Sequence, residues 1–349
     1  MAVRRLVRSW NRRDWTQVAP LIGVVVALHV IGFGALALLL SSGHNDAGVL
    51  SIGVGVGAYL LGLRHAFDAD HIAAIDNVTR KLSAERARPK SVGFWFALGH
   101  SAMVVVLALI VVGATKAAGQ LLDDDSTSRR LLGSLGSVAS GGFLYLIAAV
   151  NIVVLVGVWR AFVASRAGRL DERHLGEALS GGGFLARFLD PVMRRIKAPE
   201  QMFVVGALFG LGFDTATEVA LLALAGSGAA AGLPWYGLLI LPVLFAAGMS
   251  LLDTLDGVVM SAAYDWALVD PTRKIYYNLV VTALSVVVAV LVGSIQFITV
   301  MHDDLGWANP VTDWISSIGM DRVGLIVVCL FALTWCAAVG VWRVAGTVR

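Results

Sequence analysis

Charged residues are scarce in this sequence. They make up 15% of its 349 residues, whereas a soluble domain usually carries about 25%. Hydrophobic residues account for 58% of the chain, and they occur in runs long enough to cross a bilayer as helices. The shortage of charge therefore argues against an ordinary soluble domain and predicts an all-α polytopic membrane protein.

Several other features are missing as well. The two cysteines, Cys329 and Cys336, lie too far apart on one predicted helix to bond within it. No nucleotide-binding P-loop motif and no H-E-x-x-H metalloprotease motif occurs, so no ATP binding by this chain and no proteolysis is predicted. Seven histidines are too few for the histidine boxes of a membrane di-iron oxygenase. We predict a protein that is not an enzyme and uses no cofactor.

Hydropathy predicts about eight spans in one transmembrane domain covering residues 1–349. Most of the 27 Lys and Arg residues fall on alternate connections, starting with the N-terminus, and such basic loops face the cytoplasm. Both termini and the long loop 164–201, which joins the two halves, are therefore predicted to be cytoplasmic. The net charge of +3 reflects these loops and indicates no nucleic-acid binding. The predicted spans are 18–41, 49–78, 93–114, 141–163, 202–226, 235–262, 275–298 and 323–345.

Two stretches of the chain resemble two later ones. FDADHIA at 67–73 resembles FDTATEVA at 213–220, and FALGHS at 96–101 resembles FAAGMS at 245–250. In the predicted topology the second span runs from outside to inside, whereas the fifth runs from inside to outside. Spans 2–4 and 5–7 therefore form a predicted inverted repeat, an arrangement common in secondary transporters, whose binding site lies between the repeats.

Acidic residues outnumber basic ones inside the predicted spans. A charge at the centre of a span costs about 2.5–3.5 kcal/mol, so these residues indicate a function, and their negative excess favours a cationic substrate or protons. Helical spacing places the later acids in two pairs, with hydroxyl groups alongside; the alternative is that they only join helices by hydrogen bonds. The acids are Asp68, Asp70, Asp76, Asp214, Glu218, Asp253 and Asp256, the hydroxyl residues are Thr215, Thr217 and Thr254, and the one base is Arg64.

The stretch RHAFDADHIAAID at 64–76 combines histidines and aspartates. On a regular helix His65, Asp68 and His71 form one stripe, whereas Asp70 falls on the far side. Either Asp70 has an indirect role, such as orienting a histidine, or the helix is broken here. We favour a local break, because unwound segments at transporter sites expose backbone groups to the substrate. We interpret Arg64 as positioning Asp68 or as neutralising the empty site.

These residue types indicate a particular class of ion. Imidazole with carboxylate suits divalent nickel, cobalt, zinc, manganese or iron, whereas magnesium and calcium prefer oxygen ligands alone. No cysteine lies nearby, which argues against copper(I). His100 in the third span is a further candidate ligand. His29 stands alone in the first span, so we give it only a supporting role.

Four motifs of the chain resemble the signatures of the nickel/cobalt transporter (NiCoT) family of secondary metal permeases. RHAFDADHI at 64–72 is similar to the second-span signature without departure, and LGHS at 98–101 is similar to that of the third span. LGFDTATEVALL at 211–222 and FAAGMSLLDTLDG at 245–257 resemble those of the fifth and sixth spans. The resemblance covers essentially the whole chain.

This resemblance implies high-affinity uptake of Ni²⁺ and/or Co²⁺ as substrate, across the cytoplasmic (inner) membrane of a bacterium. The expected partners are a divalent metal ion and the lipid bilayer. The related efflux branch often has a His-rich cytoplasmic loop, whereas loop 164–201 contains only His174, which favours uptake. Export of a divalent metal is the alternative. The residues implied in metal handling are His65, Asp68, Asp70, His71, His100, Asp214, Glu218, Asp253 and Asp256.

Overall fold

The computed structural model describes most of the helical part of the chain. The described residues are 12–41, 50–85, 89–113, 127–166, 196–211, 235–267 and 271–318, with parts of 218–225 and 322–337. No strand occurs in these ranges. The elements are α2 (Arg12–Ser41), α3 (Ile52–His65), α4 (Ala69–Ala84), α5 (Val92–Gly113), α7 (Thr127–Arg166), the 3₁₀ turn η1 (Pro199–Gln201), α10 (Met202–Phe209), α12 (Trp235–Leu238), α13 (Ile240–Ala267), α14 (Pro271–Leu305) and α15 (Pro310–Ser316).

Four stretches are long and apolar enough to cross a membrane: Asp14–Ser41, Val92–Ile110, Tyr236–Tyr264 and Thr282–Asp303. They coincide with the predicted first, third, sixth and seventh spans. The stretch in α13 is largely buried inside the protein, whereas that in α2 is largely exposed, so α13 is central and α2 peripheral. The described part of the chain is therefore all-helical, as predicted, and its four apolar stretches are consistent with a polytopic membrane protein.

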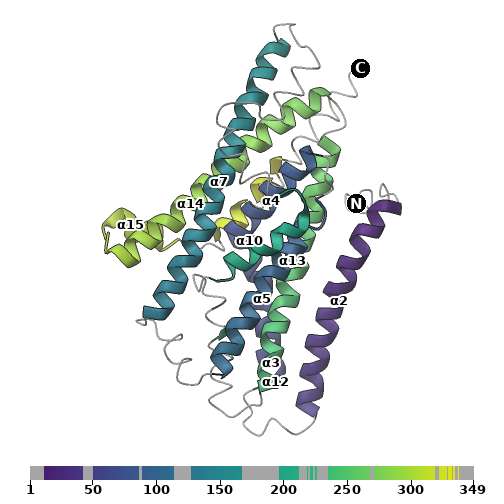
Figure 1. Cartoon of the computed structure of the whole chain (residues 1–349), viewed down its shortest axis with the longest axis vertical. Coiled ribbons are helices and arrows are strands. Elements are labelled where there is room, and N and C mark those ends of the chain that lie inside the picture. The colour runs from purple at the N-terminus through teal and green to yellow at the C-terminus, as the bar shows by residue number, and fades with distance from the viewer. Residues whose placement is uncertain are drawn as a thin grey trace.

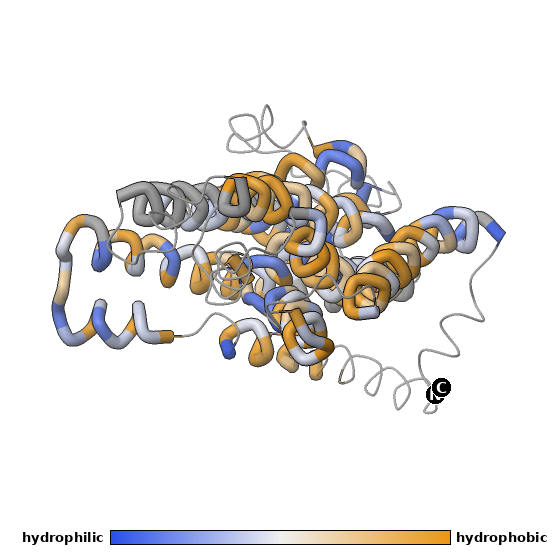
Figure 2. Tube along the Cα trace, turned by 90° about the horizontal axis from the view of Figure 1, so that it is seen from below, coloured by the Kyte–Doolittle hydropathy of each residue, from blue (hydrophilic) through white to orange (hydrophobic). Residues whose placement is uncertain are grey.

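The helices cross in pairs around α13. Helix α13 packs against α2, α3, α4 and α5, while α5 also packs against α10, and α7 lies along α14. Figure 1 shows α2 standing at one side of the bundle and the hairpin of α14 and α15 protruding at the other. In Figure 2 hydrophobic residues predominate along the crossing helices. Segments distant in sequence thus meet at the centre of the bundle.

Glycines allow two of these crossings to be unusually close. Where α5 crosses α10, Gly99 lies against the carbonyl of Phe203, and Gly206 lies against the carbonyl of Phe96. In each case a Cβ atom would overlap the backbone of the other helix. Helices α3 and α13 cross in the same reciprocal manner through Gly62 and Gly248. Close approach of backbones through small residues is typical of helix association in membranes.

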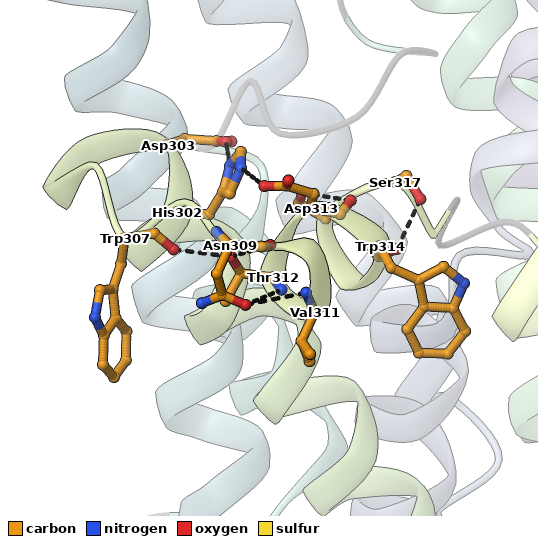
Figure 3. A network of polar contacts seen from close by, with 10 residues as sticks. His302, Asp303, Trp307, Asn309, Val311, Thr312, Asp313, Trp314 and Ser317 are labelled. Atoms are coloured by element: carbon orange, nitrogen blue, oxygen red, sulfur yellow. Dashed lines mark hydrogen bonds and ion pairs between the residues drawn. The ribbon is translucent and has the colours of Figure 1, made fainter.

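The hairpin between α14 and α15 is held by polar contacts (Figure 3). Gly306 turns the chain with a φ of 65°, which L side chains rarely adopt. Both ring nitrogens of His302 contact carboxylates, Nδ1 that of Asp303 at 2.6 Å and Nε2 that of Asp313 at 3.0 Å. The side chain of Asn309 caps α15 by accepting hydrogen bonds from its first turn. These contacts join the end of α14 to α15.

Candidate metal site

The predicted second span is broken in the middle of the RHAFDADHI motif. Helix α3 ends at His65 and α4 begins at Ala69, which confirms the expected local break. The N–H groups of Phe67 and Asp68 close α3 by bonding back to residues three positions earlier, at 3.0 and 2.8 Å. Asp68 then adopts an extended conformation with ψ of 138°. The carbonyl of Phe67 packs against Gly324, where no Cβ obstructs it.

The break brings three histidines together. The ring centroids of His65 and His71 are 4.6 Å apart, and His100 of α5 lies 4.8 Å from each of them. All three side chains are buried, with 2% of residue surface or less exposed. One ring nitrogen from each histidine lies within 4.8 Å of the others. Phe96 packs against His71 and Phe245 against His65, so an aromatic ring borders the cluster from both α5 and α13.

Carboxylates hold the δ nitrogens of two of these rings. His65 Nδ1 lies 2.7 Å from Asp68 Oδ2, and His71 Nδ1 lies 3.3 Å from Asp253 Oδ2. A carboxylate that accepts a hydrogen bond from Nδ1 leaves the Nε2 lone pair of the same ring available to a ligand. His71 Nε2 is buried without a hydrogen-bond partner among the described residues. Metal-binding histidines are usually held in this way, by a carboxylate on the second nitrogen.

Glu218 completes the buried cluster. Its Oε1 lies 2.7 Å from His100 Nε2 and 3.7 Å from His65 Nε2, and these two nitrogens are 3.1 Å apart. The side chain of Glu218 is almost fully buried. Three potential ligand atoms therefore lie in one small volume: an imidazole nitrogen from α3, another from α5, and a carboxylate oxygen from the predicted fifth span.

Asp70 contacts the backbone of α4 and a side chain of α14. Its Oδ1 accepts a hydrogen bond from the backbone N–H of His71 at 2.9 Å, and its Oδ2 accepts one from Gln296 of α14 at 3.1 Å. A carboxylate at the beginning of a helix is favoured by the helix dipole. Sequence reasoning did not select Gln296, although an amide in the otherwise apolar tract around it was a usable signal.

The other predicted site residues lie around this centre. Thr254 is buried and Asp256 is half-buried on α13, and Asp256 interacts electrostatically with Asp76. Arg64 is exposed at the end of α3. His29 joins two helices instead: its ring contacts the carbonyl of Val25 and, at 3.2 Å, the hydroxyl of Tyr59. Three predicted residues lie outside the described part of the chain: Asp214, Thr215 and Thr217.

A second polar network lies further along α4. Asp76 accepts hydrogen bonds from Tyr264 of α13 and, at 2.7 Å, from Ser285 of α14. One turn later the Arg80 guanidinium bonds Thr282 of α14 at 3.1 Å and the side chain of Asn151 on α7. The sequence marked Asp76 as a charge inside a span, but the partners come from three other helices.

The geometry is therefore that of a buried His₃–Glu cluster in which carboxylates orient two rings, within a helical membrane protein. Comparison with known proteins agrees with this chemistry. Residues 51–341 match the NicO family, described as high-affinity nickel-transport protein. The chain belongs to the NicO family. This membership also bears out the expected transporter, as opposed to an enzyme.

NicO relatives cover nearly the whole chain. The chain is 50% identical to the nickel transporter NicT of Mycobacterium tuberculosis over 97% of its own length and 92% of that protein. It is 42% identical to the nickel transporter NixA of Staphylococcus aureus, over 95% of each protein. It is 40% identical to the cobalt transport protein NhlF of Rhodococcus rhodochrous, over 95% of this chain and 93% of that one. No solved structure matches the chain.

Proposed function

We propose that this protein is a secondary permease that carries Ni²⁺ and/or Co²⁺ into the cytoplasm, and that the ion binds at the His65–His71–His100 cluster. The observation that carries the proposal is the buried His71 Nε2, which has no hydrogen-bond partner among the described residues and lies with two further imidazoles in a member of the NicO family. An unpartnered buried nitrogen is costly unless it serves a ligand.

The donor set suits this substrate. Three imidazole nitrogens and the Glu218 carboxylate are ligands that divalent first-row metals accept. An ion held about 2.1 Å from each nitrogen needs the ligand atoms closer together than the 4.8 Å of the present cluster. Small inward rotations of the rings supply this contraction. Asp68 and Asp253 would then orient His65 and His71, while Asp70 would act through the start of α4.

The glycine crossings support the inverted repeat. If spans 2 and 3 correspond to spans 5 and 6, the crossing of α3 with α13 corresponds to that of α10 with α5. Gly62 meets the carbonyl of Phe245 in one, and Gly206 meets that of Phe96 in the other; these are the matched phenylalanines of FAAGMS and FALGHS. We therefore propose that the two repeats rock around a site between them. The distribution of Lys and Arg supports eight spans with both termini cytoplasmic.

The membrane potential can drive such uptake without a second ion. Moving a divalent ion inward across an inside-negative potential of 100 mV yields about 4.6 kcal/mol. The carboxylates of the site offset the charge of the ion while it is out of water. Metal ligands must also be deprotonated to bind, so lower pH on the cytoplasmic side would favour release.

Uptake into proteoliposomes tests this proposal. Labelled Ni²⁺ and Co²⁺ would be presented to purified protein under an inside-negative potential, with Zn²⁺ and Mn²⁺ as competitors. We expect accumulation by the wild type and its loss in His71→Ala. The matched control is His302→Ala, which removes a histidine of the exposed hairpin and should transport normally.

Three results would contradict the proposal. Equal accumulation by His71→Ala and the wild type would place the ion elsewhere. A folded wild-type protein that moves neither ion under the potential would not be an uptake permease. Movement that instead required an opposing proton gradient would identify the exporter predicted as the alternative.

A further inference from the structure

A buried amide of α14 reaches the broken helix. Gln296 is 4% exposed and lies in the apolar tract LVGSIQFIT at 291–299, inside a stretch able to cross the membrane. Its Nε2 donates to Asp70 Oδ2 at 3.1 Å. A polar side chain buried within a membrane span is costly unless it is hydrogen-bonded. A hydrogen bond to a carboxylate is among the stronger hydrogen bonds.

With this contact, both carboxylate oxygens of Asp70 accept hydrogen bonds. One carboxylate oxygen accepts from the backbone N–H of His71, and the other accepts from Gln296. The break at residues 66–68 interrupts the regular helix just before this turn. The contact from α14 therefore helps to set where the first turn of α4, and with it the His71 ring, stands relative to the other histidines.

The other end of the amide is not satisfied in the same way. Gln296 Oε1 is buried without a hydrogen-bond partner among the described residues. It points toward Gly141 of α7, where a Cβ atom would lie 3.2 Å from it. A leucine or methionine, both common in such a tract, would bury no unpaired oxygen. The feature that distinguishes Gln296 from these residues is its hydrogen bond to Asp70.

We propose that Gln296 is a positioning residue for the ion site. Through Asp70 it holds the first turn of α4 so that His71 Nε2 faces His65 and His100. This inference rests on the proposed function, because it concerns the same ion. It adds the predicted seventh span to the elements that determine metal affinity, although the described side chains of that span contribute no ligand atom to the cluster.

Titration of the purified full-length protein with Ni²⁺ tests the inference. Gln296→Met keeps the length of the side chain but loses the donor, and Gln296→Asn keeps the amide but is one methylene too short to reach Asp70. We expect both variants to bind Ni²⁺ about 10- to 100-fold more weakly, as when other groups that orient metal ligands are removed. Ser294→Ala on the same helix is the matched control, because its hydroxyl contacts Tyr145 and the carbonyl of Val290.

A double-mutant cycle separates this role from a merely structural one. In an Asp70→Asn background we expect Gln296→Met to change Ni²⁺ affinity less than two-fold, because the group through which it acts is already altered. In uptake assays the variants should raise KM more than they lower the maximal rate. Thermal unfolding, measured in parallel, should show both variants folded; if Gln296→Met fails to fold, Gln296→Asn provides the comparison.

The outcomes are distinguishable. Binding by the wild type with equal affinity in both Gln296 variants would refute the inference and leave the proposed function standing. An equally large effect of Gln296→Met with and without Asp70→Asn would also refute it, because the residue would then act independently. A folded wild type that binds no Ni²⁺ would refute the proposed function and this inference together.

Discussion

Gly99 lies where α5 crosses α10, one residue before the histidine that α5 contributes to the site. A Cβ atom at this position would lie 2.7 Å from the carbonyl carbon of Phe203 and 2.9 Å from its Cα, and closer still to the oxygen. Carbon atoms in contact are normally about 3.5–4.0 Å apart. Gly99→Ala therefore requires the two helices to separate by roughly 1 Å.

This separation should affect both stability and metal binding. Overpacking of this kind costs about 1–3 kcal/mol of unfolding free energy. It also moves His100, whose Nε2 lies 2.7 Å from Glu218 and 3.1 Å from the Nε2 of His65. Because a shift of roughly 1 Å is enough to break a hydrogen bond, we expect Ni²⁺ affinity to fall about 10- to 100-fold, as when other supports of metal ligands are lost.

Thermal unfolding in detergent and Ni²⁺ titration would measure the two effects. The matched control is Gly57→Ala on α3, where an added Cβ meets nothing within 4 Å. Alanine is better than glycine in a helix by about 0.5–1 kcal/mol, so the control should be at least as stable as the wild type. The reasoning would be refuted if Gly99→Ala matched Gly57→Ala in both unfolding temperature and affinity.

Three further predictions concern other contacts. Asp253→Asn keeps the shape but replaces the carboxyl group beside His71 Nδ1 with an amide, so calorimetry should show Ni²⁺ affinity lowered about 10- to 100-fold; unchanged affinity would mean that His71 needs no carboxyl group there. Tyr264→Phe removes a donor to the buried Asp76 and should lower the unfolding free energy by about 1–3 kcal/mol, measurable by denaturant titration; equal midpoints would count against this network. Asn309→Ala removes the cap of α15, which costs about 1 kcal/mol of helix stability. The backbone amides of α15 should therefore exchange hydrogen faster, while uptake stays at the wild-type rate.

The break in the second span was predictable because helix geometry and chemistry disagreed there. A straight helix separates Asp70 from the stripe of His65, Asp68 and His71, and the structure resolves the conflict by ending α3 at His65. The break does not turn all four side chains toward one ion, however. Asp68 contacts the ring of His65, whereas Asp70 accepts hydrogen bonds from the backbone of His71 and from Gln296.

Contacts between helices were not predictable from one sequence. The partners of Asp76 and Arg80 lie 71 to 209 positions away, and hydropathy carries no information about such distances. The glycines of the crossings were equally hidden, because glycine is frequent in membrane helices in general and this chain contains 38. Only their reciprocal placement on α3, α5, α10 and α13 shows which ones bring backbones together.

Residue types read along the chain indicate a membrane protein and the kinds of ligand expected at its candidate site. Membrane insertion depends on the sum of residue hydropathies, and metal preference depends on ligand types, and both can be read along the chain. The tertiary structure decided which atoms meet: the three imidazoles of His65, His71 and His100 and the Glu218 carboxylate. Their convergence depends on where a helix breaks and how closely neighbouring backbones cross, and these are properties of packed helices that no single segment contains.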